Sequence, residues 1–261
     1  MSAAPTTPGL PALCALTRRE LVRMLRQPSR VIATLGAPLL LWVFLAGGFA
    51  ASFNPPSADG ATGGYAAWLL PGMVSLVVMF SAMFSSMSLI DDRNAGFLQG
   101  AIVSPAPRWA IIGAKILGGA AVAAVQGAVL LCSAPLVGLW PGPFGLALAL
   151  LGATLSAVFI TSLGLTFAWW VNSSQGFHGV MNLVLMPMWL LSGAFFPAEG
   201  ASRWLAVLMN LNPLRWTTDA IRSALAGEPS PVAWGLTLGL SAASIAVALL
   251  AMGAHESRRN D

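Results

Sequence analysis

Residues 65–90 read YAAWLLPGMVSLVVMFSAMFSSMSLI, a run in which no side chain carries a charge. A helix crosses the bilayer's hydrocarbon core with about 20 apolar residues at about 1.5 Å of rise each. This run is therefore long enough to span. Across the chain, 57% of the 261 residues are hydrophobic and 8% are charged, whereas a soluble domain carries about 25% charged residues. The composition predicts an all-α membrane protein.

Other apolar stretches of similar length predict six transmembrane helices in a single transmembrane domain, residues 1–261. We expect the spans near residues 31–53, 65–90, 110–139, 144–171, 180–197 and 232–252. The third and fourth stretches are longer than a span needs, so we expect tilting, a kink at Pro135 or emergence into water. The fifth is the shortest, and Pro187 lies in its middle.

Positive charges are distributed unevenly between alternate links. With a cytoplasmic N-terminus, all of the 13 Lys and Arg residues lie inside except Arg203, Arg215 and Arg222. Because positive residues resist translocation, both termini are expected in the cytoplasm of a bacterial cell, with the chain crossing the inner membrane several times. The net charge of +4 is then a topology signal and does not indicate a nucleic-acid partner. Lys115 is expected to extend its ammonium group to the inner surface.

Motifs of catalytic chemistry are missing from the sequence. The surroundings of Lys115 do not fit the phosphate-binding pattern G-x-x-x-x-G-K-[ST]. His178 and His255 lie far from any Cys, Asp or Glu cluster, and no histidine in a later span could act as a base for Ser192. We therefore expect no enzyme active site, metal or cofactor in this chain, and any ATP has to be bound by another chain.

Residues 11–27 predict an amphipathic helix on the inner membrane surface. Its apolar stripe is Leu13, Leu16, Leu21, Met24 and Leu25, and its basic face is Arg18, Arg19, Arg23 and Arg26. We expect the arginines to contact lipid phosphates. Such a helix could be a topology anchor alone, or a lever between the membrane and a cytoplasmic partner.

Residues 91–108 form a cytoplasmic link with a short apolar face. The link opens with two aspartates and ends at Pro105 and Pro107. Between them, Phe97, Leu98 and Ala101 favour docking of a protein partner. A helix that lies on its own bundle or on lipid is the alternative.

Residues 198–231 form a long external link that is only partly polar. The break at Asn212 and Pro213 leaves two pieces that are each too short to span, so we expect a re-entrant helical hairpin in the outer leaflet between spans five and six. Arg215 and Asp219 are four residues apart, which favours an ion pair on a helix.

The second span carries a stripe of flexible apolar side chains. The candidate residues for lining a transport pathway are Met73, Phe80, Met83, Phe84 and Met87. Methionine adapts to varied ligands, yet ordinary packing explains the stripe equally well. A pathway without buried charge suits an amphipathic or apolar cargo and argues against ion coupling.

Four motifs occur in a fixed order along the chain. They are Gln27-Pro28-Ser29-Arg30 after the amphipathic start, Asp92-Arg93 to Phe97-Leu98 closing on Ser104-Pro105 and Arg108, Leu191-Ser192-Gly193 leading to Phe196-Pro197, and Asn212-Pro213-Leu214 followed by Arg222. Over nearly the whole chain this set resembles the ABC-2 family of ATP-binding-cassette transporter permeases, in its drug- and oligosaccharide-exporter branch.

The resemblance implies a permease subunit that exports a drug, lipid, glycolipid or oligosaccharide. It further implies a second permease copy in a homodimer and two separate ATPase subunits that bind ATP and Mg. Residues 11–27 correspond to the connecting helix, and residues 91–108 to the coupling helix that contacts the ATPase. The implied docking residues are Asp92, Arg93, Gly96, Phe97, Leu98 and Ala101.

The resemblance also implies that the hairpin of residues 198–231 lines the outer exit, with Arg215, Trp216, Asp219 and Arg222. Trp216 stands where the family more often has a smaller or polar residue, so the hairpin is expected deeper in lipid. Asn94-Ala95 stands where an acid and a basic residue are common, which would weaken polar contacts to the ATPase.

A self-contained channel or secondary transporter is the alternative function. Inverted repeats or carboxylates inside the membrane would favour it, and the sequence shows neither. If the chain instead works with a partner ATPase, closure of two ATPase subunits would push on Phe97 and Leu98 and tilt the first two spans. We expect this movement to drive transport by alternating access.

Overall fold

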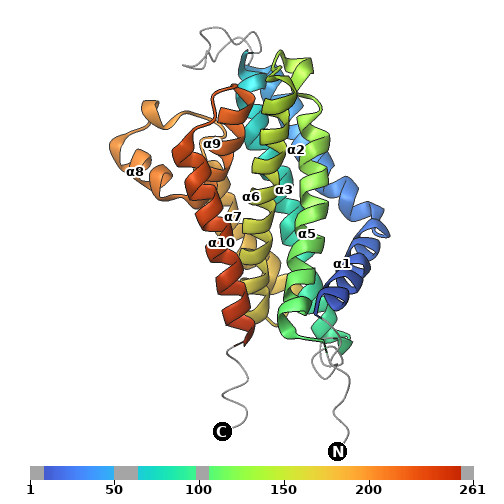
Figure 1. Ribbon diagram of the computed structural model, residues 1–261. Coiled ribbons are helices and arrows are strands. Elements are labelled where there is room, and N and C mark those ends of the chain that lie inside the picture. Colours follow the sequence, from blue (N-terminus) through green and yellow to red (C-terminus); the bar gives the residue numbers. More distant parts are fainter. Residues whose placement is uncertain (1–8, 50–63, 98–105, 254–261) are drawn as a thin grey trace, which may run out of the picture.

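The computed structural model describes residues 9–49, 64–97 and 106–253, and every regular element in these ranges is helical (Figure 1). The elements in order are α1 (Gly9–Leu25), α2 (Pro28–Phe49), α3 (Gly64–Asn94), α5 (Arg108–Leu131), the 3-10 helix η1 (Ala134–Val137), α6 (Gly142–Trp170), α7 (Ser174–Leu190), the 3-10 helix η2 (Ala198–Gly200), α8 (Arg203–Leu211), α9 (Pro213–Leu225) and α10 (Pro231–Gly253). The all-helical prediction is confirmed over these ranges.

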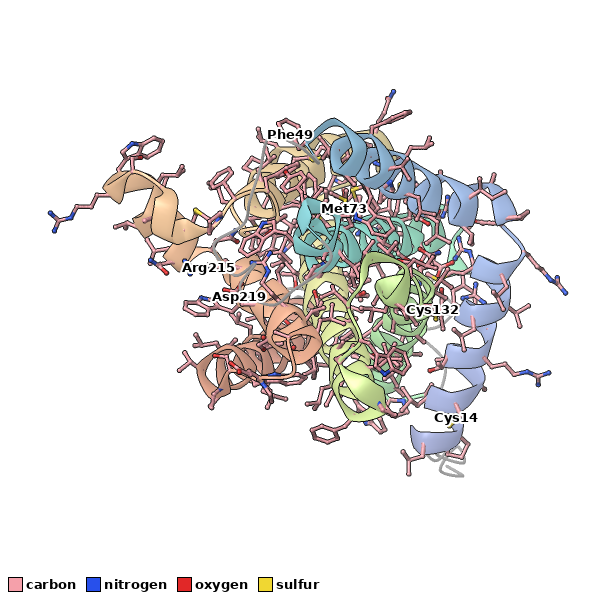
Figure 2. All side chains as sticks on the ribbon, turned by 90° about the horizontal axis from the view of Figure 1, so that it is seen from above. Cys14, Phe49, Met73, Cys132, Arg215 and Asp219 are labelled. Atoms are coloured by element: carbon pink, nitrogen blue, oxygen red, sulfur yellow. The ribbon has the colours of Figure 1, made fainter. Side chains whose placement is uncertain are left out.

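Helix α3 forms the centre of the bundle. It packs against α2, α5, α6, α7 and α9, and Met73 lies near the middle of the molecule when the bundle is seen from above (Figure 2). The most apolar window of α3 is 83% buried, whereas that of α2 is 17% buried. Helices α2, α5 and α6 therefore pack around α3, α10 packs on α6 and α9, and these outer helices turn much of their own surface outward, as helices in lipid do.

Small residues let these helices approach closely. A Cβ at Gly72 would lie 2.8 Å from Ala194 Cα, and a Cβ at Gly164 would lie 2.9 Å from Ser86 Cβ. Contacts of this kind bring helix backbones together in membrane proteins, where no hydrophobic force acts between helices.

Proline and glycine set several helix ends. Helix α1 ends just before Pro28, the first residue of α2. Helix α5 ends at Leu131, and Pro135 follows within η1, so the expected irregularity of the third stretch is confirmed. Gly138 closes η1 with φ of 76°, a conformation that favours glycine.

The limits predicted for the fifth span are wrong. Helix α7 covers Ser174–Leu190, whereas residues 180–197 were expected. The hydroxyl of Ser173 accepts a hydrogen bond from the amide of Gly176, which caps an earlier start. Past Leu190 the chain turns through Gly193, whose φ is 79°. Among the described residues, five helices are long and apolar enough to cross a membrane, and this 17-residue helix falls outside that set.

The link of residues 198–231 forms two short helices, as expected. Asn212 separates them: its side chain donates to Met188 O at 2.5 Å and accepts from the amide of Leu214 at 3.1 Å. Helix α9 packs against α6 and α10, whereas α8 stands away from the bundle (Figures 1 and 2). The start of α1 and the end of α10 lie toward the end of the bundle where α3 ends and α5 begins (Figure 1).

Candidate functional site

A buried lysine joins three helices where α3 ends and α5 begins. The ammonium nitrogen of Lys115 on α5 lies 2.6 Å from Asp92 Oδ2 on α3 and 3.2 Å from Glu20 Oε1 on α1. It also donates to Ser88 Oγ at 3.3 Å. The lysine is 5% exposed, Glu20 3% and Asp92 2%. The expectation that Lys115 extends to the surface is therefore wrong, because two carboxylates hold the ammonium group inside the bundle.

A glycine on α5 explains how α1 comes so close. Gly118 lies one turn after Lys115, and a Cβ built there would lie 2.7 Å from Glu20 Cβ. Positions three apart share a helix face, so the gap left by Gly118 places the Glu20 backbone beside the lysine. Any larger residue would move α1 away from α5.

Two of the four arginines in residues 11–27 face the bundle. Arg23 Nη1 lies 2.6 Å from Asp92 Oδ1, and Arg19 lies 3.4 Å from Asp92 Oδ1 and 3.0 Å from Glu20 Oε1. Arg18 and Arg26 are exposed. The expectation that all four arginines contact lipid phosphates is therefore wrong for Arg19 and Arg23, because two aspartates at the end of α3 lie within their reach.

The start of the 91–108 link is fixed on two sides. The guanidinium carbon of Arg19 lies 3.6 Å from the ring centroid of Phe97. Arg93 donates to Ala168 O at 2.7 Å and to Asn172 Oδ1 at 3.0 Å. The link thus leaves the bundle between α1 on one side and the end of α6 on the other.

The implied docking residues differ in accessibility. Asp92 is buried and Arg93 is half-buried, and both are used by contacts within the chain. Gly96 is exposed with φ of 74°, and Phe97 is half-buried. Leu98 and Ala101 lie outside the described residues, so their docking role stays a prediction. Phe97 is the apolar docking candidate that the structure places at the surface of the bundle.

Sequence reasoning missed Glu20 and the role of Lys115. Glu20 is the sole acid in residues 11–27, and Lys115 is the only lysine in the chain. A lone charge in apolar or oppositely charged surroundings usually has a partner. The isolation of Glu20 and of Lys115 in the sequence could therefore have indicated an ion pair. The cluster of Glu20, Asp92, Lys115, Arg19 and Arg23, hereafter the charged joint, connects α1, α3 and α5.

The charged joint holds α1, α3 and α5 together. Its acids and cations form ion pairs with each other. Within residues 9–49, 64–97 and 106–253, no group of three or more His, Cys, Asp or Glu side chains could hold a metal ion. The arrangement can transmit movement between the link and three helices.

The residues expected at the outer exit also form a network. Asp219 pairs with Arg215 at 3.2 Å, which confirms the pair expected from the spacing, and with Arg222 at 3.4 Å. Arg222 also donates to Gly193 O at 2.8 Å and lies over the ring of Trp68. Arg215 and Asp219 lie on the side of the bundle from which α8 projects (Figure 2). This network fastens α9 to the end of α7.

The methionine stripe of α3 lies inside the bundle. Met73, Met83 and Met87 are buried among the core residues, and Phe80 and Phe84 are half-buried. Within one chain the three methionines pack the core, so they do not line an open pathway in this structure. Phe84 reaches the edge of the core, where its ring meets His178 edge to face at 5.2 Å.

Comparisons with known proteins identify the family. The family described as ABC-2 type transporter matches residues 11–226. The probable multidrug ABC transporter permease YbhR of Escherichia coli K12 is 30% identical over 163 residues, which are 59% of this chain and 42% of that protein. The putative transport permease ycf38 of Cyanophora paradoxa is 25% identical over 214 residues, 80% of this chain and 72% of that protein. The chain thus spans less than half the length of the Escherichia coli relative.

Proposed function

The chain belongs to the ABC-2 type transporter family, and from this premise we propose that it is the permease subunit of an exporter driven by ATP hydrolysis on a separate subunit. Its long apolar helices make it a multi-pass membrane protein. We assign ATP and Mg to two copies of the partner ATPase, and we pair the chain with a second, identical permease.

The observation that carries this proposal is the contact between Arg19 and Phe97 beside the charged joint. Phe97 follows directly on α3, and Arg19 connects it to Glu20 and Asp92. Force applied to Phe97 by an ATPase would therefore reach α1, α3 and α5 together. In this proposal residues 91–108 are the coupling helix and residues 11–27 the connecting helix.

The proposed topology has six crossings. Helix α7 is the fifth, because its 17 residues extend about 25 Å, close to the bilayer's apolar thickness. The charged joint then lies at the cytoplasmic end together with both termini, and α8 and α9 form the external hairpin of residues 198–231. The excess of Lys and Arg on the cytoplasmic side supports this orientation in a bacterial inner membrane.

The proposed cargo is amphipathic or hydrophobic. The Escherichia coli relative is named as a probable multidrug permease, which supports a drug-like or lipid-like substrate. The two buried acids of the joint, Glu20 on α1 and Asp92 at the end of α3, each pair with Lys115. They are thus structural partners of a fixed cation, which does not favour an ion-coupled transporter.

The test is a charge placed on the docking surface. Phe97→Asp should reduce both co-purification of the ATPase and transport-stimulated ATP hydrolysis at least about tenfold, equivalent to about 1.4 kcal/mol of binding free energy. The matched control is Phe144→Asp, which makes the same change at a 74% exposed ring near the start of α6. Unchanged ATP hydrolysis in Phe97→Asp would exclude the docking assignment. Loss of both co-purification and ATP hydrolysis in Phe144→Asp would indicate a folding defect.

A further inference from the structure

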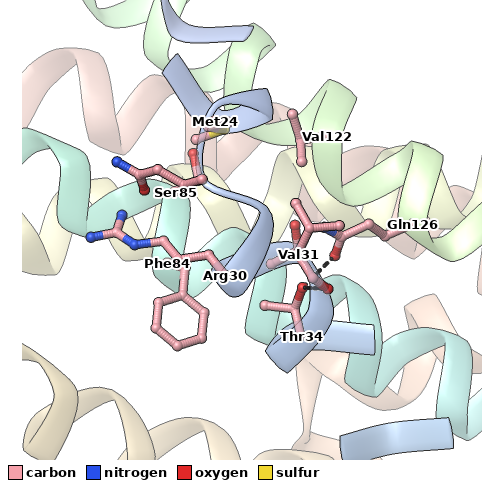
Figure 3. A pocket seen from close by; sticks show the side chains of 10 residues that line it. Met24, Arg30, Val31, Thr34, Phe84, Ser85, Val122 and Gln126 are labelled. Carbon is pink, nitrogen blue, oxygen red and sulfur yellow. Dashed lines mark hydrogen bonds between the residues drawn. The ribbon is translucent and has the colours of Figure 1, made fainter. Parts of the chain in front are cut away.

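A hollow lined by apolar side chains and a few polar ones lies where α1 turns into α2. Its walls come from that junction, from α3 and from α5, and Figure 3 shows Arg30, Thr34, Phe84 and Gln126 around it. The hydroxyl of Thr34 donates to Gln126 Oε1 at 2.9 Å and closes one side. The hollow lies outside the charged joint and has no part in the proposed docking.

Several buried donors in the hollow lack a partner. Gln126 is 4% exposed, and among the described residues its amide nitrogen has no hydrogen-bond acceptor. Ser81 and Ser85 are 5% and 4% exposed, and their hydroxyls likewise form no hydrogen bond within residues 9–49, 64–97 and 106–253. None of these three donors is fully enclosed, so they remain open to the hollow and can donate to a ligand that accepts hydrogen bonds.

Arg30 gives the hollow its charge. Its side chain is 33% exposed, and its Nη2 lies 3.7 Å from Asp91 Oδ2, farther than a hydrogen bond. Asp91 is shared with Arg23 at 3.7 Å, so it neutralises Arg30 only in part. A guanidinium with free N–H groups binds phosphate oxygens in bidentate geometry, which favours an anion over a neutral acceptor.

The remaining walls indicate what the anion is attached to. Phe84, Val31 and Val122 are apolar and lie beside the donors. The interior volume is about 30 Å³, and about 310 Å³ is empty when the open mouth is included. The interior has room for a small polar group, and the rest of a ligand has to extend outward along α2, which is largely exposed. A small anionic head with an apolar tail fits both requirements.

We propose that this hollow binds the phosphate group of a phosphate-bearing amphiphile, with Arg30 and Gln126 donating to the phosphate oxygens. Its tail lies along α2 against Val31 and Phe84. The anion chemistry is independent of the proposed function, and only the assignment to the inner leaflet rests on the proposed topology. Such a site would recognise either a membrane lipid or a cargo that carries a phosphate.

The test measures binding to the purified full chain without any ATPase. Native mass spectrometry with dioctanoyl phosphatidic acid should show binding at least about tenfold tighter than with dioctanoylglycerol, which has the same tails without phosphate. Arg30→Gln should weaken phosphatidic acid binding at least about tenfold. Gln126→Glu keeps an acceptor for Thr34 but replaces the amide donors by an anion, so it should weaken binding at least as much.

Controls separate the hollow from general surface charge. Arg18→Gln removes an exposed arginine on α1 and should change the affinity less than about twofold. Equal binding of the two lipids, or full affinity in both Arg30→Gln and Gln126→Glu with unchanged thermal stability, would overturn the proposal. Inorganic phosphate at millimolar concentration tests the need for an amphiphile: we expect the lipid to stay bound, and its displacement would overturn the amphiphile in favour of free phosphate.

Discussion

The two ends of the bundle are held together by different chemistry. At one end, charged side chains join α1, α3 and α5, with Lys115 between Asp92 and Glu20. At the other end, neutral hydrogen bonds join α3 to its neighbours: Ser75 Oγ lies 2.8 Å from Thr218 Oγ1, and Trp189 donates to Gly72 O at 2.8 Å. Both sets of α3 contacts are buried, so the contrast between them is one of charge and not of exposure. The end with the neutral α3 contacts also holds the ion pairs of Asp219, but these lie within α9 and are partly exposed.

This contrast has energetic consequences. A buried ion that loses its partner is left uncompensated, at a cost of about 3 to 5 kcal/mol. A buried neutral hydrogen bond contributes about 1 kcal/mol. The stability of the charged end therefore depends on few residues, whereas that of the neutral end is spread over close contacts and several hydrogen bonds.

The strongest way to break the charged end is Lys115→Met. This change leaves Glu20 and Asp92 buried without their shared cation, although Arg19 and Arg23 still compensate Asp92. We expect the free energy of unfolding to fall by about 3 kcal/mol, measured by denaturation in mixed detergent micelles. Arg18→Met, an exposed control on α1, should change it by less than about 0.5 kcal/mol.

Adding Glu20→Gln to Lys115→Met sharpens this test. In Lys115→Met the buried Glu20 keeps only Arg19 as its partner, and neutralising Glu20 removes this poorly compensated charge, so part of the lost stability should return. A double variant whose free energy of unfolding is clearly lower than that of Lys115→Met would contradict the contact of Lys115 with both acids.

The neutral end is best broken by overpacking. Gly72→Ala would place a methyl group against the Cα of Ala194, 2.8 Å away, and should lower the free energy of unfolding by about 1 to 3 kcal/mol. The matched control is Gly239→Ala on α10, where nothing lies within 4 Å of the new methyl group. There the change should be neutral or stabilising by up to about 1 kcal/mol. Equal effects at the two glycines would show that close packing does not hold this end.

The smallest effect is expected at a single hydrogen bond. Ser75→Ala removes the contact with Thr218, whose hydroxyl keeps its bond to Leu214 O at 2.9 Å. We expect a loss of about 0.6 to 1 kcal/mol in the same unfolding measurement. A double-mutant cycle with Thr218→Val measures the coupling free energy between Ser75 and Thr218. If this value exceeded the coupling free energy between Lys115 and Glu20, the neutral contact would be the stronger one, contrary to the comparison of the two ends.

Local sequence features predicted the helix breaks and one ion pair of the fold well. Proline positions marked the break between α1 and α2 and the end of α5, and Asn212-Pro213 marked the division of the external link. The pair of Arg215 and Asp219 followed from helical spacing alone. These features depend on residues close together in the chain, which a single sequence displays directly.

The charged joint could not be predicted in the same way. Glu20, Asp92 and Lys115 come from three separate helices, and their meeting depends on the closeness that Gly118 allows. Helical periodicity placed the four arginines of residues 11–27 on one face but could not show that aspartates of α3 would draw two of them inward. The limits of α7 were missed because the cap at Ser173 and the turn at Gly193 outweigh hydropathy.

Chemical labelling of the Lys115 amine would report when the charged joint opens. The chain contains no other lysine, so its single ε-amine can be acylated by an amine-directed ester only when the contact with Asp92 and Glu20 opens. A single mass increment on the peptide containing this residue would then count opened molecules. Any conformational cycle that separates α1 from α5 could be followed in the unmodified protein, without introducing a label.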